Sequence, residues 1–366
     1  MARWPLGGIR TYLRYMLRYF PSAYSLTVLA ASTQEDAALT KDAVGYGARL
    51  ILIREAGVKE LVAAVYRELR TGTYDVILSQ GFISAVVTCS ANFLFRVPHV
   101  LTIHGIVEPK YITGNFGRLK KFILGKMLSR ITVLYAVGND ILGHVYEQLP
   151  TLKDDGPRAI VIPNGIEVEE LDAVPAAQIE LRVQLGIDDS VFLFGFFGRF
   201  MQQKGFDLLI QAVDLLRKQE CNRPFAIVAV GSGDYLESYR KTIRESDLDS
   251  LFFFVPFQPQ AHYLFSQVDA IVMPSRWEAG SLLAMEVLCA GRPLIASDCL
   301  GLRETVRDTP ATVFRSEDAA ALAGALEASM TEPCAEKFLR FKPKARARFD
   351  VAASAQKLVQ LIDGIE

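Results

Sequence analysis

Short, continuously apolar runs alternate with longer amphipathic stretches along this chain of 366 residues. Such runs are typical of parallel strands buried on both faces, and the stretches between them predict the helices that cover the sheet. Because the alternation occurs twice, we expect two doubly wound, Rossmann-like α/β domains. The expected strands are residues 26–30, 49–53, 76–79, 100–103, 131–137 and 159–162 in the first half, and 191–197, 225–230, 251–255, 270–273 and 294–296 in the second.

A polar stretch without strand character, residues 164–184, separates the two halves. We therefore predict an N-terminal domain over residues 1–168 and a C-terminal domain over residues 169–350, with the last helix, about residues 351–366, packing back on the first domain. Residues 1–168 hold 19 Lys/Arg and 13 Asp/Glu, whereas the remainder holds 21 and 28. The first domain is therefore basic and the second acidic, which indicates that they meet different partners.

The sequence argues against several classes of protein. The five cysteines are scattered without a Cys-x2-Cys pair, which disfavours a zinc site or a disulfide framework and fits a reducing cytoplasm. No apolar run reaches the roughly 18–20 residues of a membrane span. The Walker A, Gly-x-Ser-x-Gly and His-Glu-x-x-His patterns are absent from the sequence. The acidic pair Asp247 and Asp249 precedes a predicted strand, so we expect it at the surface, without a metal.

Two glutamates, Glu278 and Glu286, flank a predicted strand-to-helix junction. If the helix begins near Ser281, Glu278 lies in the loop before it and Glu286 lies in its second turn. The free N–H groups of the first turn, around Ser281 and Leu282, then form an anion site between the two carboxylates. This arrangement suits a ligand with hydroxyl groups at both ends and phosphate in the middle, which is the shape of a nucleotide-sugar.

A second loop carries cations between two glycines. It follows the predicted strand 191–197 and contains Arg199 and Lys204 between Gly198 and Gly205. Glycine lets the backbone approach a ligand closely, and the two cations suit a diphosphate. We therefore expect this loop to bind a diphosphate rather than to be an ordinary solvated basic turn.

Three further positions follow or begin predicted elements. The pair Gly7-Gly8 opens an amphipathic helix and could cradle phosphate. His104 ends a strand and is followed by glycine, a placement that favours contact with a ligand. Gly231 begins a loop that lacks the third glycine of a dinucleotide fingerprint, because Leu236 stands there, but that could pass a base or ribose closely.

Together these residues resemble the retaining glycosyltransferases of glycosyltransferase family 4, the group 1 transferases with the GT-B fold. The resemblance spans nearly the whole chain, and its most specific part is the glutamate pair followed by Gly-x-Pro. The motifs that carry it are Gly7-Gly8, His104-Gly105, Pro163-Asn164-Gly165-Ile166, Gly198-Arg199, Lys204-Gly205, Gly231-Ser232-Gly233, Glu278-x7-Glu286 and Ala290-Gly291-Arg292-Pro293.

The resemblance implies transfer of a sugar from a nucleotide-diphosphate sugar to a glycan or lipid-linked acceptor in polysaccharide biosynthesis. It implies no metal, no other cofactor and no nucleic-acid partner, and front-face displacement in which the donor phosphate helps to take the acceptor proton. The residue roles it implies are Arg199 and Lys204 for the donor diphosphate, the Gly8 loop closing over the phosphates, Glu286 for the ribose, Glu278 for the donor sugar and His104 for the sugar or the reaction centre.

Two features depart from the family pattern. The family has Glu-x-x-Gly from the first glutamate, whereas this chain has Glu278-Ala279-Gly280-Ser281, so the sugar pocket is expected to differ. The family also has an apolar strand before the Gly-Gly loop, whereas here residues 1–6 precede it and include Pro5. We therefore expect the first strand of the N-terminal sheet to be truncated or missing, either because the true start lies upstream or because the domain is incomplete.

Two other functions fit parts of the pattern. A nucleotide-sugar 2-epimerase of the same fold would need acid and base residues around C2, and His104 alone among the four histidines is well placed for that. A non-catalytic nucleotide-sugar-binding subunit would fit a truncated first strand, although Arg199, Lys204, Glu278 and Glu286 are all present.

One segment of the N-terminal domain suggests reversible contact with an anionic membrane. No acidic residue occurs between Glu108 and Asp140, whereas Arg118, Lys120, Lys121, Lys126 and Arg130 all do. On a helix that begins near Phe116, Leu119, Phe122 and Ile123 would share one face, with cations on its flanks. The alternative is an ordinary packed helix with a solvated basic face.

Overall fold

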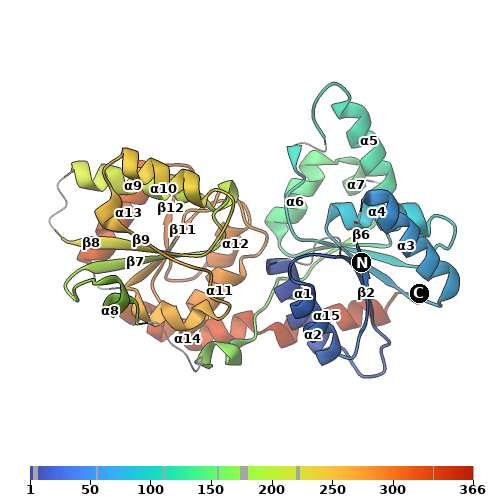
Figure 1. Cartoon of the computed structure of the whole chain (residues 1–366). Coiled ribbons are helices and arrows are strands. Elements are labelled where there is room, and N and C mark those ends of the chain that lie inside the picture. The colour runs from blue at the N-terminus through green and yellow to red at the C-terminus, as the bar shows by residue number, and fades with distance from the viewer. Residues whose placement is uncertain are drawn as a thin grey trace. The chain divides into compact units, whose positions relative to one another are not determined.

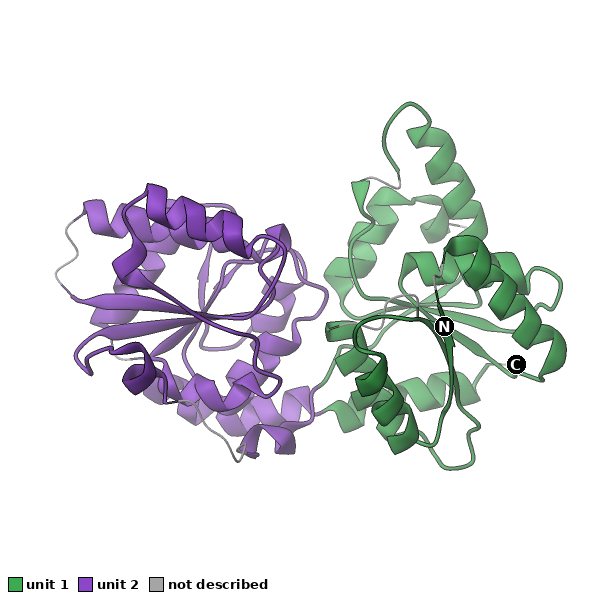
Figure 2. Ribbon diagram, viewed as in Figure 1, with its two compact units in different colours: residues 1–165, 351–366 green, residues 166–350 purple. Residues whose placement is uncertain are grey.

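The structure is a computed structural model that describes residues 1–2, 7–54, 57–109, 112–154, 156–173, 180–219, 223–332 and 334–365. The chain divides into two compact units (Figures 1 and 2): unit 1 is Met1–Gly165 with Val351–Glu366, and unit 2 is Ile166–Asp350. The boundary between the units therefore lies after Gly165, whereas the sequence suggested a boundary after residue 168. The C-terminal segment lies in unit 1, where its helix contacts the first helix of the chain.

The strands of unit 1 are parallel. They are β1 (Thr27–Ala31), β2 (Arg49–Ile53), β3 (Ile77–Gln80), β4 (His99–Ile103), β5 (Val133–Ala136) and β6 (Arg158–Val161). β1 pairs with β2, and β3 to β6 pair in chain order. Ala2 joins the two sets, because it forms parallel bridges with both Ala30 of β1 and Gln80 of β3. Met1 and Ala2 therefore hold the place of a central strand, which the sequence predicted to be truncated or missing.

Helices cover both faces of this sheet (Figure 1). The helices are α1 (Gly8–Arg18), α2 (Asp36–Gly45), α3 (Val58–Thr71), α4 (Phe82–Asn92), α5 (Gly117–Leu128), α6 (Asn139–Gln148), α7 (Thr151–Asp154) and α15 (Val351–Asp363). α1 packs with α2 and α15, whereas α3 packs with α4. Leu29 of β1 contributes to a core with Leu61 and Val65 of α3 and Val87 of α4.

Unit 2 contains one continuous parallel sheet in the order β12-β11-β10-β7-β8-β9. Its strands are β7 (Phe192–Phe197), β8 (Phe225–Val230), β9 (Phe252–Val255), β10 (Ala270–Met273), β11 (Leu294–Ser297) and β12 (Thr312–Phe314). Five of them match the predicted strands, and β12 was not predicted. Aromatic rings fill its core: Phe206, fully buried, contacts the rings of Phe196, Phe200, Tyr239, Phe252 and Phe254.

The helical elements of unit 2 include the short 3-10 segments η2 (Val168–Asp172), η3 (Gln202–Lys204), η4 (Asp249–Leu251) and η5 (Ala261–Gln267). The α-helices are α8 (Leu181–Leu185), α9 (Phe206–Lys218), α10 (Leu236–Glu245), α11 (Leu282–Ala290), α12 (Leu302–Val306), α13 (Ala319–Thr331) and α14 (Ala335–Phe349). Among the described residues, no helix is both long and apolar enough to cross a membrane. The parallel sheets and two α/β units confirm the predicted fold class.

The strand order of unit 2 locates its ligand-binding edge. From the central strand β7, the chain continues to β8 and β9 on one side and then crosses to β10, β11 and β12 on the other. In sheets of this kind, ligands bind at the carboxyl ends of the strands, at the point where the order reverses. The loops that follow β7 and β10 flank that point.

Candidate functional site

The loops after β7 and β10 are packed directly against each other. Gly205 closes the first loop with a φ of +64°, and a Cβ at this position would overlap the carbonyl oxygen of Pro274 in the second. The N–H of Arg276 donates to the carbonyl of Gln203 at 2.8 Å, and the side-chain amide of Gln203 donates to the carbonyl of Trp277 at 3.0 Å. Glycine at position 205 is therefore required for the approach that brings the two loops together.

This approach pairs two of the predicted site residues. The Nζ of Lys204 donates to Oε1 of Glu278 at 2.7 Å, and the Oγ of Ser275 donates to the same oxygen at 2.7 Å. Glu278 is 5% exposed, so its charge is compensated inside the protein rather than by water. An ammonium group has three donors. The bond to Glu278 uses one, which leaves the others of Lys204 for a ligand.

The loop after β8 holds the other side of the β7 loop. Gly231 comes so close to Gly198 that a Cβ on it would overlap the Gly198 carbonyl oxygen, and the N–H of Phe200 donates to the Ser232 carbonyl at 2.9 Å. Between these anchors, Arg199 is exposed. Its side chain forms no hydrogen bond or ion pair with any of the described residues, so its guanidinium is available to an anion.

Helix α11 begins where the sequence predicted it. Ser281 is its N-cap: it is 4% exposed, and its Oγ accepts from the N–H of Ala284 at 3.5 Å. The first-turn N–H groups, starting at Leu282, have no partner within the helix, and the first turn contains no acidic residue. Glu286 is half-buried and lies four residues after Leu282, hence on the same helix face. Glu278 and Glu286 thus flank the start of α11.

A set of bonds from Arg276 links this site to helix α9, and the sequence did not predict it. Arg276 binds Asp207 of the first turn of α9 through two bonds, of 2.9 and 2.6 Å, and donates to the Gln202 carbonyl at 2.7 Å and to Glu317 at 3.1 Å. Burial opposes ionisation of Asp207, but the bonds from Arg276 outweigh it and lower the pKa of Asp207. The sequence signal for this contact is the position of Arg276, two residues before Glu278.

The predicted residues of unit 1 lie at the carboxyl edge of its own sheet. His104 follows β4, its Nε2 lies 2.6 Å from Oε1 of Gln80, and its ring meets that of Tyr12 edge to face at 4.5 Å. Desolvation lowers the pKa of His104 to about 3, so the ring is neutral at pH 7. Gly8 is exposed at the start of α1 and follows Gly7, the N-cap of that helix. Gln80 and Tyr12 are contacts that sequence reasoning missed.

The seven predicted residues Arg199, Lys204, Gly231, Glu278, Ser281, Leu282 and Glu286 all lie in unit 2, at the ends of β7, β8 and β10. His104 and Gly8 lie in unit 1. Among the described residues, no group of three or more His, Cys, Asp or Glu side chains could hold a metal ion. Asp247 and Asp249 are exposed between α10 and β9.

Two family models match the chain in succession. The model "Glycosyltransferase Family 4" matches residues 6–170, and the model "Glycosyl transferases group 1" matches residues 177–348. These ranges correspond closely to the N-terminal part of unit 1 and to unit 2.

Named relatives and solved structures agree with these models. A D-inositol 3-phosphate glycosyltransferase of Frankia alni is 29% identical over 72% of this chain and 67% of its own length. A protein of the same name from Pseudarthrobacter chlorophenolicus is 25% identical over 68% of this chain and 60% of its own. The match thus spans about three fifths to two thirds of these relatives. HepE of Anabaena, solved in complex with UDP-glucose, superposes with a TM-score of 0.78 at 20% identity and covers 98% of this chain and 97% of its own. The chain belongs to the group 1 glycosyltransferases of glycosyltransferase family 4, and its two α/β units have the GT-B fold.

Proposed function

We propose that this protein is a retaining glycosyltransferase that moves a sugar from a nucleotide-diphosphate sugar to a glycan or lipid-linked acceptor, without a metal. The observation that carries the proposal is the junction of the β7 and β10 loops. There the Lys204–Glu278 pair, the exposed Arg199 and the first turn of α11 meet at the switch point of the unit 2 sheet. Cations and helix N–H groups are complementary to a diphosphate, and carboxylates are complementary to sugar hydroxyls.

The largest catalytic contribution is electrostatic. As the bond to the sugar breaks, negative charge grows on the departing nucleoside diphosphate, and preorganised donors stabilise that charge without reorganising. Arg199, the remaining donors of Lys204 and the Leu282 N–H fill this role in the proposal. Because these groups already neutralise the phosphates, the proposed reaction needs no divalent cation.

The carboxylates position the two ends of the donor. Glu278 orients the donor sugar, and its bond to Lys204 links the sugar end of the site to the diphosphate end. Glu286 and the Gly231 loop bind the nucleoside. His104, neutral at pH 7, acts near the sugar as a hydrogen-bonding group, and the donor phosphate oxygen accepts the proton of the attacking hydroxyl on the same face. This order of events retains the configuration at the anomeric carbon.

A donor panel tests the proposal. The full chain is incubated with UDP-, GDP- and ADP-sugars, with and without EDTA, and release of the nucleoside diphosphate is measured. UDP-glucose comes first, because HepE was solved with it. We expect one donor to be hydrolysed slowly without an acceptor, equally well in EDTA. Interconversion of two nucleotide-sugars would instead establish the epimerase, and binding without turnover, even when acceptor glycans and lipids are supplied, would establish a binding subunit.

The acceptor side of the proposal rests on helix α5. Its residues Leu119, Phe122 and Ile123 are 53%, 56% and 49% exposed, and Phe116 just before the helix is 67% exposed. The apolar face that the sequence predicted is therefore not packed within the protein. Phe93 and Leu94, directly after α4, are also exposed, and the guanidinium of Arg130, just beyond the end of α5, lies 4.8 Å from the centre of the Phe93 ring.

Basic side chains flank this apolar face, and Arg118, Lys120, Lys126 and Arg130 are all exposed. Apolar groups that insert and cations that attract anionic headgroups are the two components of a reversible interfacial contact. We therefore propose that α5 brings the enzyme to an anionic membrane surface where a lipid-linked acceptor lies, as a peripheral protein of the cytoplasmic face.

Co-sedimentation with vesicles tests this contact. We expect binding to vesicles that contain phosphatidylglycerol, weaker binding as salt increases, and no binding to pure phosphatidylcholine. Phe122→Ser and Lys120→Ser should each weaken it, whereas Lys241→Ser, an exposed lysine of α10 in unit 2, should not. Equal binding by all three variants would rule out α5 as the contact.

A further inference from the structure

Strand β4 begins with one histidine and is followed directly by another, and β3 supplies a hydrogen-bond partner to each. His99 uses both ring nitrogens inside the protein: its Nε2 lies 2.7 Å from the Oγ of Ser79, and its Nδ1 lies 3.7 Å from the Sγ of Cys89. His104 uses only one. Its Nε2 lies 2.6 Å from Oε1 of Gln80, and its Nδ1 forms no hydrogen bond with any described residue. The second nitrogen of His104 is therefore available to a ligand.

Gln80 belongs to a row of buried polar side chains at the carboxyl edge of the unit 1 sheet. It is the last residue of β3 and pairs with Thr102 of β4, which in turn pairs with Tyr135 of β5. Their exposed fractions are 7%, 1% and 0%. Paired residues of neighbouring strands point to the same face of the sheet, and so do residues two apart along one strand. His104 comes two positions after Thr102, so its ring lies on the face where Gln80 is held.

Helix α1 contacts this row through Tyr12. The rings of Tyr12 and His104 meet edge to face with their centres 4.5 Å apart, and the Tyr12 hydroxyl lies 3.3 Å from that of Tyr135. Gly8, the exposed first residue of α1, lies four positions before Tyr12 and hence on the same face of the helix. His104 is half-buried, and its Nδ1 is not completely enclosed. The unused nitrogen is therefore near the edge where the sequence predicts that Gly8 meets phosphate.

The contact with Gln80 determines which ring nitrogen of His104 carries the proton. Desolvation lowers the pKa of His104 to about 3, and no charge of a described residue contributes to that change, so the neutral ring has a single N–H at pH 7. An amide oxygen can only accept, so the proton of the 2.6 Å contact is on Nε2 and Nδ1 keeps a lone pair. The facing hydroxyl of Tyr12 stays neutral as well, because burial raises the pKa of Tyr12 well above its usual value.

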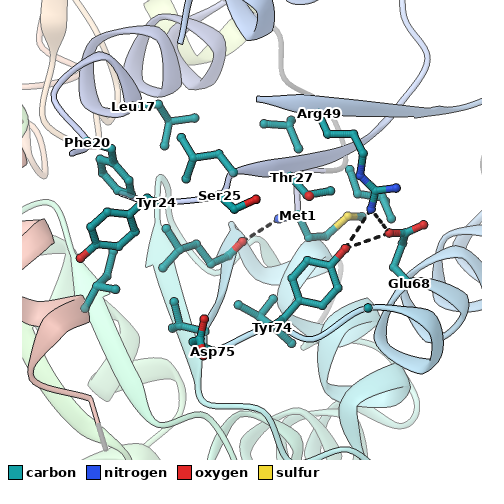
Figure 3. A pocket seen from close by; sticks show the side chains of 18 of the residues that line it. Met1, Leu17, Phe20, Tyr24, Ser25, Thr27, Arg49, Glu68, Tyr74 and Asp75 are labelled. Carbon is teal, nitrogen blue, oxygen red and sulfur yellow. Dashed lines mark hydrogen bonds and ion pairs between the residues drawn. The ribbon is translucent and has the colours of Figure 1, made fainter. Parts of the chain in front are cut away.

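A cavity beside Gln80 leaves room for the other end of its amide group (Figure 3). The cavity has a volume of about 720 Å³ and extends inside unit 1 from the amino ends of β1 and β3, near Ser25 and Asp75, to Gln80. The amide NH₂ of Gln80 forms no hydrogen bond with any described residue, and a space of this size can hold water that accepts from it. Gln80 can therefore keep its oxygen on His104 without burying an unpaired donor.

We propose that Gln80 is a positioning residue that holds the ring of His104 in the Nε2–H tautomer, so that Nδ1 accepts a hydrogen bond from a hydroxyl group of the donor sugar. This inference rests on the proposed function, in which His104 acts near that sugar. Gln80 does not touch the ligand and acts only through the ring. Because a lone pair accepts but cannot donate, the site selects a ligand group that has a proton to share.

Nitrogen NMR spectra of the histidine rings test the tautomer on the full chain without a ligand. The ring nitrogens of histidine are labelled with ¹⁵N, and the signals of His104 are identified by their absence from His104→Phe. At pH 7 we expect Nε2 of His104 to have the chemical shift of a protonated nitrogen and Nδ1 that of an unprotonated one. The opposite pattern, or averaged shifts from a mixture of the two tautomers, would overturn the proposal, whether or not the chain transfers a sugar.

Two substitutions of Gln80 test the consequence for the donor. The rate measured is hydrolysis of UDP-glucose, or of whichever donor the panel identifies in its place, together with the melting temperature of each variant. Gln80→Leu removes the acceptor of the Nε2 proton and lets both tautomers form, so kcat/KM should fall about five- to tenfold. Gln80→Glu supplies an acceptor again and should restore the wild-type rate at about pH 8.

The pH dependence of Gln80→Glu separates positioning from simple packing. A carboxylate beside His104 favours the imidazolium form and should raise the pKa of His104 by about one to three pH units. An imidazolium carries a proton on both nitrogens and has no lone pair for the sugar hydroxyl. The ratio of the Gln80→Glu rate to the wild-type rate should therefore fall between about pH 8 and about pH 5, whereas a side chain that only fills space would leave that ratio constant.

Ser79→Ala is the matched control, because it removes the β3 partner of the other histidine. It should leave the His104 signals and the pH dependence of the rate unchanged. A constant rate ratio for Gln80→Glu at every pH, or full turnover by a folded Gln80→Leu, would overturn the role of Gln80. If the spectra show Nε2–H but no donor is turned over, the proposed function fails and the link to a donor hydroxyl fails with it, while the hold of Gln80 on the ring is supported.

Discussion

The two units use the same architecture but differ at the centre of the sheet. In unit 2 the central strand β7 has six residues, pairs with neighbours on both sides and is buried along nearly its whole length. In unit 1 the central place is held by Met1 and Ala2, with a cavity beyond them. In a doubly wound domain the central strand contacts helices on both faces. We therefore infer that unit 2 is the more stable half and that the stability of unit 1 depends more strongly on solution conditions.

Lowering the pH should produce the largest difference in stability between the two units. Desolvation lowers the pKa of both His99 and His104 of unit 1 to about 3, and that of the Met1 amine to about 5. A base with a lowered pKa in the folded state binds more protons when unfolded, so the stability that it contributes is complete above its unfolded pKa and is lost as pH falls toward the folded value. Each histidine therefore costs on the order of 4 kcal/mol by pH 3, beginning near pH 6.5.

Hydrogen exchange across a pH series measures this effect unit by unit. We expect the strands of unit 1 to lose protection between pH 6.5 and 4, while β7 and β8 stay protected. Nε2 of His99 lies 2.7 Å from the Oγ of Ser79. His99→Gln, which keeps a polar group near Ser79, should shift the loss toward lower pH. Simultaneous loss of protection in both units would contradict the inferred difference.

Truncation of core side chains should give the next largest difference in stability between the two units. Phe206→Ala in unit 2 removes a fully buried ring that contacts five others and should cost about 3–5 kcal/mol. Leu29→Ala in unit 1 lies beside the cavity, where packing is already incomplete, and should cost about 2 kcal/mol, the low end of its class. Urea unfolding of the two variants measures both values, and a larger cost for Leu29→Ala would reverse our ranking.

Disrupting the Lys204–Glu278 ion pair should reduce stability less than the core truncations do, but should reduce activity more. Lys204→Met leaves the buried carboxylate of Glu278 without its cation and should cost about 1–3 kcal/mol in unit 2. Adding Glu278→Gln removes the unpaired charge, so the double variant should recover most of the stability but none of the donor turnover. Turnover by the double variant at the wild-type rate would remove both residues from the proposed mechanism.

The smallest effect is expected on the surface of α5. Phe122→Ser and Lys120→Ser should change the free energy of unfolding by no more than about 0.5 kcal/mol, because both side chains are exposed. Chemical unfolding without vesicles measures this value. A clear destabilisation would mean that these residues stabilise unit 1 itself, and would weaken their proposed role at a membrane.

The sequence predicted what depends on local pattern. Strand positions in both units, the start of α11 and the glutamates around it follow from apolar runs, capping and spacing, and the structure has them where they were expected. The sequence did not predict the short strand β12, because Thr312–Phe314 is too brief to form a recognisable apolar run. The ion pair between Lys204 and Glu278 could not be predicted, because it depends on two loops 74 residues apart packing through Gly205.

The return of α15 to unit 1 has a consequence for the order in which the chain folds during synthesis. Unit 2 is one uninterrupted stretch, Ile166–Asp350, whereas unit 1 needs both the first 165 residues and the helix that follows residue 350. Once residues 1–350 have been synthesised, every residue of unit 2 has been made, while α1 still lacks the helix it packs against. Domains generally fold as units when their residues are complete. The half that is translated second is thus the first able to finish folding, and unit 1 waits for the last helix to emerge.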